Sequence, residues 1–120
     1  MRTLDFPVTE SRDQDGEVFS IPTPNIASDK MIPLNTEGRR QLGVRLGDPP
    51  GRASLSRWRK HGYPVDRDGP RVKLPYVVKV KRVYTTTKAL YQFLQLVQWL
   101  QEQIQEAGSI TRWRAGRKRR

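Results

Sequence analysis

The most regular apolar pattern in the chain lies between residues 86 and 106. Apolar side chains recur there at steps of three and four, at Leu90, Phe93, Leu94, Val97, Leu100 and Ile104. This spacing lines one face of a helix, while the opposite face is rich in glutamine and carries little charge. Threonines at residues 85–87 can cap its start, and Gly108 can end it. The pattern predicts one long amphipathic helix.

A shorter helix is predicted over residues 53–61, directly after the Gly-Asp-Pro-Pro-Gly break at residues 47–51. Leu55 and Trp58 stand three residues apart and therefore share a face, whereas Arg57 and Lys60 lie away from it. A preceding short helix is expected between residues 35 and 43. Two short helices joined by a turn, the second of them basic, are typical of a helix-turn-helix.

Alternating charged and apolar residues predict a β-hairpin over residues 71–84. Its strands are Arg-Val-Lys-Leu at residues 71–74 and Val-Lys-Val-Lys-Arg-Val at residues 78–83, with Pro75 and Tyr76 between them. Beside a helix-turn-helix, such a basic hairpin is a wing. The predicted fold class is therefore mainly α with a small β-hairpin, a winged helix-turn-helix with a long C-terminal helix. The expected core is Leu55, Trp58, Leu74, Tyr84, Leu90 and Phe93.

Charge is distributed unevenly along the chain. The 120 residues carry 23 Lys and Arg against 12 Asp and Glu, a net charge of +11. Residues 1–30 hold six of the acids and three of the bases, and their apolar residues keep no period, so we expect a flexible acidic arm. Residues 31–108 are the expected winged domain, and residues 109–120 a basic tail. The positive charge favours a polyanionic partner, and double-stranded DNA is the expected one.

Three stretches in order, WRKHGYPV, then RVKLP with KVKRVYTT, then KALYQFL, resemble the excisionase-type winged helix-turn-helix, which is related to the MerR-like DNA-binding domains. In that family a recognition helix ending in W-x-x-x-G leads to a small hairpin and then to a Y-T-x-x-A-L-x-x-F helix. More narrowly, the chain is similar to a family of short bacterial proteins with L-x-R-W-R-x-x-G and Y-T-T-x-x-A-L-x-x-F signatures. The likeness covers residues 32–96.

Two features depart from this family pattern. The turn at residues 47–51 is longer than in its tightest members, and Pro-Tyr-Val-Val at residues 75–78 replaces the usual glycine-rich wing tip. The resemblance implies DNA binding, and we expect a small regulator or a recombination accessory factor. A protein-interaction or RNA-binding adaptor that uses the long helix and the basic tail is the alternative.

The expected DNA contacts fall on three elements. The helix over residues 53–61 would enter the major groove, and the wing over residues 71–84 would lie on the backbone or in the minor groove. The tail would add contacts to phosphates. The candidate residues all carry hydrogen-bond donors and are Arg52, Ser54, Ser56, Arg57, Arg59, Lys60, Arg71, Lys73, Lys79, Lys81, Arg82, Arg112, Arg114, Arg117, Lys118, Arg119 and Arg120. The alternatives are a solvated helix face and an edge strand protected by lysine.

Trp58 is expected in the core, whereas Trp113, among arginines in the tail, is the better candidate for stacking on a base. The chain has no cysteine and one histidine, His61, so we expect no metal, no cofactor and no enzymatic activity. No apolar run has the length of a membrane span and the N-terminus lacks a signal-peptide core, so no membrane partner is expected. We expect a cytoplasmic protein associated with the nucleoid.

Two expectations concern how the parts of the chain meet. The apolar stripe from Val97 to Ile104 is expected to form a homodimer, with the alternative that Phe19 and Ile21 of the acidic arm fold back over it. The basic tail is expected to contact phosphates, with the alternative that it neutralises the acidic arm.

Overall fold

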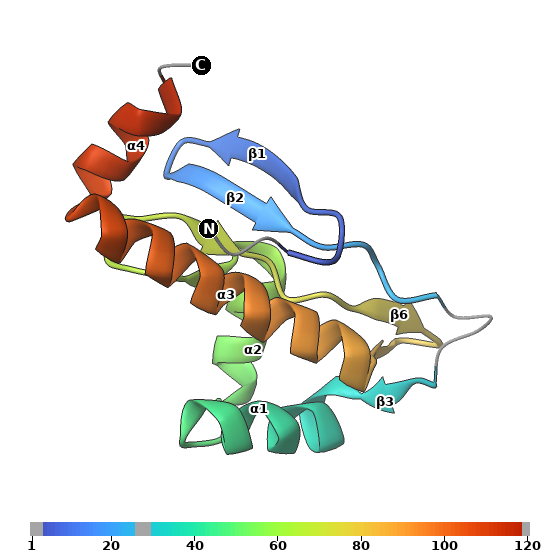
Figure 1. Cartoon of the computed structure of the whole chain (residues 1–120). Helices are drawn as coiled ribbons and strands as arrows, with labels where there is room; N and C mark the ends of the chain where they lie inside the picture. The colour runs from blue at the N-terminus through green and yellow to red at the C-terminus, as the bar shows by residue number, and fades with distance from the viewer. Residues whose placement is uncertain (1–3, 26–29, 119–120) are drawn as a thin grey trace.

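The computed structural model describes residues 4–25 and 30–118. Its helical elements are the π-helical turn η1 (Leu34–Gly38), α1 (Arg39–Leu46), α2 (Arg52–Lys60), α3 (Thr87–Ala107) and α4 (Ile110–Lys118). Its strands are β1 (Thr9–Asp13), β2 (Gly16–Ser20), β3 (Ile32–Pro33), β4 (Tyr63–Pro64), β5 (Arg71–Val72), β6 (Val77–Lys79) and β7 (Arg82–Thr85). Figure 1 shows α3 crossing the molecule, with β1 and β2 on one side of it and α1 and α2 on the other.

The strands form two sheets. The first has the order β1-β2-β5-β4, in which only the β2–β5 pair is parallel. The second has the order β3-β7-β6 and is antiparallel throughout. The predicted fold class, a mainly α winged helix-turn-helix with one small hairpin, is therefore wrong. The chain is a small α+β fold with a four-stranded mixed sheet and a three-stranded sheet.

Residues 9–20, which lie in the expected flexible arm, form the hairpin β1–β2. Its turn is closed by the carboxylate of Asp13, which accepts a hydrogen bond from the Asp15 N–H at 2.8 Å, and by Gly16 at φ 119°. Strand β2 buries Val18 and Phe19, both 4% exposed, while β1 is exposed along its whole length. Because β1 has no buried face, its residues show no apolar alternation that would predict a strand.

The predicted hairpin over residues 71–84 is also wrong. Strand β5 pairs with β2 and β4, and the hairpin is formed by β6 and β7. The backbone donors of the expected first strand go elsewhere: Lys73 N–H donates to the Phe19 carbonyl at 2.9 Å, and Leu74 N–H donates to the Trp58 carbonyl at 3.1 Å. Pro75, which follows, has no N–H to give to a ladder. The turn lies at residues 80 and 81, where the predicted second strand was continuous.

The predicted helices over residues 53–61 and 86–106 are confirmed as α2 and α3. Thr86 caps α3 by accepting the Ala89 N–H at 3.0 Å, and Gly108 ends it at φ 92°. The short helix expected between residues 35 and 43 is formed by η1 and α1 and continues to residue 46.

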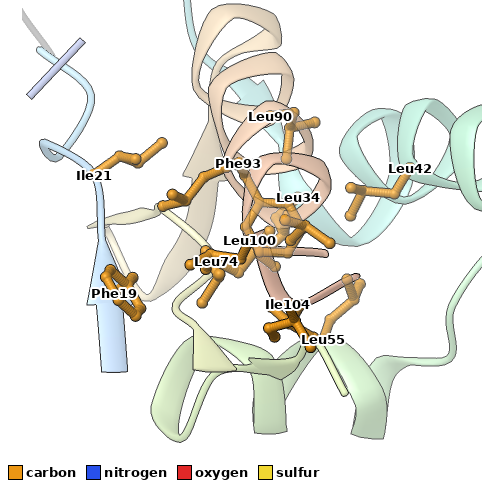
Figure 2. Packing of buried hydrophobic residues seen from close by; sticks show 14 of the residues in the cluster. Phe19, Ile21, Leu34, Leu42, Leu55, Leu74, Leu90, Phe93, Leu100 and Ile104 are labelled. Atoms are coloured by element: carbon orange, nitrogen blue, oxygen red, sulfur yellow. The ribbon is translucent and has the colours of Figure 1, made fainter. Parts of the chain in front are cut away.

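Helix α3 supplies the middle of the core. Figure 2 shows Leu90, Phe93 and Leu100 of α3 among Leu34, Leu42, Leu55 and Leu74 from the surrounding elements. Of the six expected core residues, Leu55, Leu74, Leu90 and Phe93 are buried, whereas Trp58 and Tyr84 are half-buried. No helix in the described part of the chain is long and apolar enough to cross a membrane.

The stripe expected to pair with a second copy is buried within the chain itself. Val97, Leu100 and Ile104 are at most 7% exposed and belong to the same apolar cluster as Phe19 and Ile21. A homodimer through residues 97–104 would require this core to open. Val97, Leu100 and Ile104 therefore offer no exposed apolar stripe to a second copy, and Phe19 and Ile21 of the segment expected to be an arm belong to the same core.

Replacing Phe19 tests whether the N-terminal hairpin belongs to the core. We expect Phe19→Ala to lower the free energy of unfolding by about 3–5 kcal/mol, the usual cost of removing a buried aromatic ring. Urea denaturation followed by tryptophan fluorescence measures this change. The matched control is Val44→Ala, because Val44 is 70% exposed, and its effect should stay within about 0.5 kcal/mol. Equal stability of the two variants would contradict the packing of β2.

Candidate nucleic-acid interface

Helix α2 is docked through one face and exposes the other. Leu55 is fully buried, and the Trp58 ring meets the Tyr63 ring edge-on, with centroids 4.8 Å apart. Tyr63 in turn packs against Phe93 of α3 at 6.0 Å. These aromatic contacts fix the rotation of α2 about its own axis. As a result the predicted DNA contacts Arg52, Arg57 and Lys60 are exposed, and Ser54 and Ser56 are half-buried beside them.

The C-terminal end of α2 is joined to the segment that leads into β6. The Arg59 guanidinium lies over the Tyr76 ring, 5.0 Å from its centroid, and the Trp58 carbonyl accepts the Leu74 N–H. Arg59 is half-buried as a result. It is therefore less available to a ligand than the sequence suggested, and its contact with Tyr76 joins α2 to the residue that precedes β6.

The hairpin β6–β7 carries the second group of exposed cations. Lys79 and Arg82 are directly opposite each other in the ladder, and Lys81 lies in the turn between them. All three are exposed, as is Lys73 in the preceding segment. The turn places Val80 at φ 50° and Lys81 at φ 62°. A β-branched residue rarely adopts this left-handed conformation, which costs on the order of 1–3 kcal/mol.

Arg71 has partners inside the chain. Its guanidinium donates to the His61 carbonyl at 2.8 Å and pairs with the Asp13 carboxylate. The hydrogen bond from Arg71, together with the Asp15 N–H, holds the pKa of Asp13 below its ordinary value of 3.8. The structure thus separates Arg71 from the other wing cations and uses it to connect β5 with the β1–β2 turn.

Residues 110–118 of the expected basic tail form α4, which packs against β2. Trp113 is 6% exposed and lies 6.4 Å from the Phe19 ring, so its ring is not available for stacking on a base. Arg117 lies over the Trp113 ring, 4.7 Å from its centroid, and pairs with Glu10. Arg112 is exposed. Arg119, Arg120 and the side chain of Lys118 lie outside the described part of the chain.

Arg114 makes the most extensive of the tail contacts. Its Nε and Nη2 atoms donate to the Glu17 carboxylate at 3.0 Å each, and Nη2 also donates to the Asp68 carbonyl at 2.9 Å. Glu17 is 3% exposed. Burial raises the pKa of Glu17, but the hydrogen bonds from Arg114 and the nearby Arg114 and Arg12 charges outweigh it and bring the pKa below 4.5. Arg114 thus neutralises a buried acid on β2.

The cations among the predicted site residues therefore fall into two sets within the described part of the chain. The exposed cations make no ion pair there and are Arg52, Arg57, Lys60, Lys73, Lys79, Lys81, Arg82 and Arg112. The engaged ones are Arg59, Arg71, Arg114 and Arg117. The structure joins the C-terminal end of α2 to residues 74–76, which lead into β6, whereas α4 lies against β1 and β2.

Sequence reasoning missed Tyr76 and Val80. The turn at Val80 could have been found from the break in alternation after it, because the next apolar residue of that run is Val83 rather than residue 82. No pattern in the sequence predicts the contact between Tyr76 and Arg59. Among residues 4–25 and 30–118, no group of three or more His, Asp and Glu side chains is placed to hold a metal ion.

The pairing of Glu17 with Arg114 predicts a specific pH dependence. Because folding lowers the pKa of Glu17, this pair stabilises the protein fully above pH 4.5, and its contribution is lost as the pH falls through the lower folded value. We expect Glu17→Gln to lower the free energy of unfolding at pH 7 by about 1.5–3 kcal/mol. Urea denaturation should show this difference shrinking below pH 4.5.

The control for this prediction is Glu106→Gln, since Glu106 is exposed on α3. The free energy of unfolding of Glu106→Gln should match that of the unmodified protein at pH 7 and also below pH 4.5. A difference between Glu17→Gln and the unmodified protein that stays constant down to pH 2–3 would contradict an ionised Glu17 in the pair.

Comparison of the chain with models of protein families, with curated proteins and with solved structures finds no match in any of the three. The resemblance to excisionase-type domains therefore stays a prediction.

Proposed function

We propose that this protein binds double-stranded DNA, with α2 in the major groove and the β6–β7 hairpin on the neighbouring backbone or minor groove. The observation that carries the proposal is that α2 and the β6–β7 hairpin, two exposed basic elements, are connected through residues 74–76. The Arg59–Tyr76 contact and the Leu74–Trp58 hydrogen bond join them. Their exposed cations have no acidic partner in the described part of the chain.

The dimensions of α2 support this assignment. A helix of nine residues is about 14 Å long, and the major groove, about 12 Å wide, admits an α-helix. Arg57 can donate two hydrogen bonds to a guanine edge, the commonest specific contact, while Arg52 and Lys60 can reach phosphates on either side. The packing of Leu55 and Trp58 holds the helix in this orientation before any ligand arrives.

The ion pairs divide the cations into those that balance acids within the fold and those that remain exposed to a ligand. Arg114 and Arg117 balance Glu17 and Glu10 within the fold, so these two arginines contribute little net charge to a ligand. The cations of α2 and the hairpin remain for phosphates. Binding of this kind suits a small regulator or a recombination accessory factor, which would act at the nucleoid.

Replacing Arg57 and Lys60 tests the role of α2. We expect Arg57→Ala with Lys60→Ala to weaken binding to a preferred duplex by at least about tenfold, since one bidentate contact to a base is worth about 1–3 kcal/mol. Both side chains are exposed, so thermal stability should not change. Fluorescence anisotropy at fixed salt measures the affinity.

The matched control removes the same charge from exposed cations outside the two elements, with Lys30→Ala and Arg67→Ala. This variant should bind nearly as well as the unmodified protein. Equal losses in the two double variants would indicate a general charge effect and contradict a specific role for α2.

Replacing Lys79 and Arg82 tests the hairpin. Each phosphate contact adds about −0.9 to the slope of log affinity against log salt. We expect Lys79→Gln with Arg82→Gln to flatten this slope by roughly one to two units, with preference among sequences retained. The titration is repeated with duplex RNA and single strands. Tighter binding to duplex RNA or to a single strand than to duplex DNA would contradict the proposal. Tighter binding to RNA would favour an RNA-binding adaptor.

A further inference from the structure

The tip of the β6–β7 hairpin exposes an apolar side chain. Val80 is 87% exposed, more than any other large apolar residue in the described part of the chain. Isolated exposed valines are common on protein surfaces and by themselves indicate nothing. The position of Val80 is unusual because the residue occupies the first place of a two-residue turn, between Lys79 and Arg82, which close the ladder.

The backbone at this turn makes the choice of valine unfavourable. Val80 and Lys81 both have positive φ, 50° and 62°. Two-residue turns of this kind favour Asn-Gly or Asp-Gly, because those residues tolerate the left-handed region. Valine is among the residues that tolerate it least. A strained residue that adds no packing points to a function outside the fold.

The surroundings of Val80 indicate a polyanionic partner. Lys79, Lys81 and Arg82 flank it and are exposed. An apolar side chain flanked by cations fits a surface on which phosphates lie at the edges and stacked bases lie between them. The minor groove of DNA has this arrangement, and proteins that bend DNA insert apolar side chains between its base steps.

The base of the hairpin is rigid enough to hold such a tip. Thr85, fully buried, donates from Oγ1 to the Pro75 carbonyl at 3.0 Å. Strand β7 also pairs with β3 on its other side, and Val77 is buried at the start of β6. The two strands are therefore fixed at the end away from the turn, and the tip projects from a supported ribbon.

We propose that Val80 is a wedge that enters the minor groove and partly unstacks one base step, so that the bound duplex bends. This inference rests on the proposed DNA binding and adds a mechanism for it. Pyrimidine–purine steps, which unstack most easily, are the expected point of entry. The bend should lie within the range of about 20–90° that other side-chain wedges produce.

The test uses the full chain and a duplex with donor and acceptor dyes at its ends and 2-aminopurine at a central TA step. Bending brings the dyes together, and unstacking raises the 2-aminopurine fluorescence. The variant is Val80→Asn, which suits the left-handed turn and removes the apolar wedge. We expect it to fold with equal or greater stability, to lose roughly half or more of the bend, and to bind less than about tenfold more weakly because the cations remain.

The matched control is Val78→Thr, because Val78 is an exposed, β-branched residue of the same hairpin, 59% exposed, that lies outside the turn. It should bend DNA as the unmodified protein does. A second variant, Val80→Leu, should retain the bend and the 2-aminopurine signal. If Val80→Asn does not fold, Val80→Ala takes its place and should show a smaller bend than the unmodified protein.

The outcomes separate this inference from the function on which it rests. If the unmodified protein binds no duplex, the proposed function fails and the wedge fails with it. If the unmodified protein binds and Val80→Asn bends the duplex equally, the wedge alone is overturned. Vesicles of anionic lipid form the remaining arm, and Val80-dependent binding to them without DNA bending would also overturn the proposal in favour of a membrane surface.

Discussion

The parallel pairing of β2 with β5 is the contact on which the rest of the chain depends. It sets Phe19 opposite Val72, and the Lys73 N–H donates a hydrogen bond to the Phe19 carbonyl. Residues 71–74 are thereby removed from the hairpin, so that the ladder of β6 and β7 forms further along the chain. Phe19 of β2 also packs against Trp113 of α4, and the Leu74 N–H, two residues beyond β5, donates to the Trp58 carbonyl of α2.

Net charge alone gives a misleading picture of this protein. A value of +11 suggests a basic surface on every element of the later part of the chain. The fold instead pairs some cations with acids, as in Arg114 with the buried Glu17, and leaves others in water, as in Arg57 and Lys79. Ion pairs within the fold are therefore the filter that distinguishes a candidate ligand contact from a structural charge.

Local patterns predicted α2 and α3 well, because the signals that start, orient and end a helix lie within a few residues of one another. The apolar period of α3 and the Thr86 cap are such signals. The β2–β5 pair has no comparable signal, since its partners are about 50 residues apart and β1 has no buried face. The exposure of Arg57 could be predicted from its position on the helix. The ion pair between Arg71 and Asp13 could not, because it depends on a strand pairing that no local pattern indicates.

The bond between Glu17 and Arg114 joins residues 97 positions apart. During synthesis the hairpin β1–β2 leaves the ribosome before α4 has been translated. The Glu17 carboxylate and the Phe19 ring then lack Arg114 and Trp113, the α4 residues that they contact in the folded chain. Contacts of such sequence separation form slowly, since the entropy of closing a long loop must be overcome first. The nascent chain is therefore most exposed to aggregation at β2 until α4 has been translated and packs against this strand.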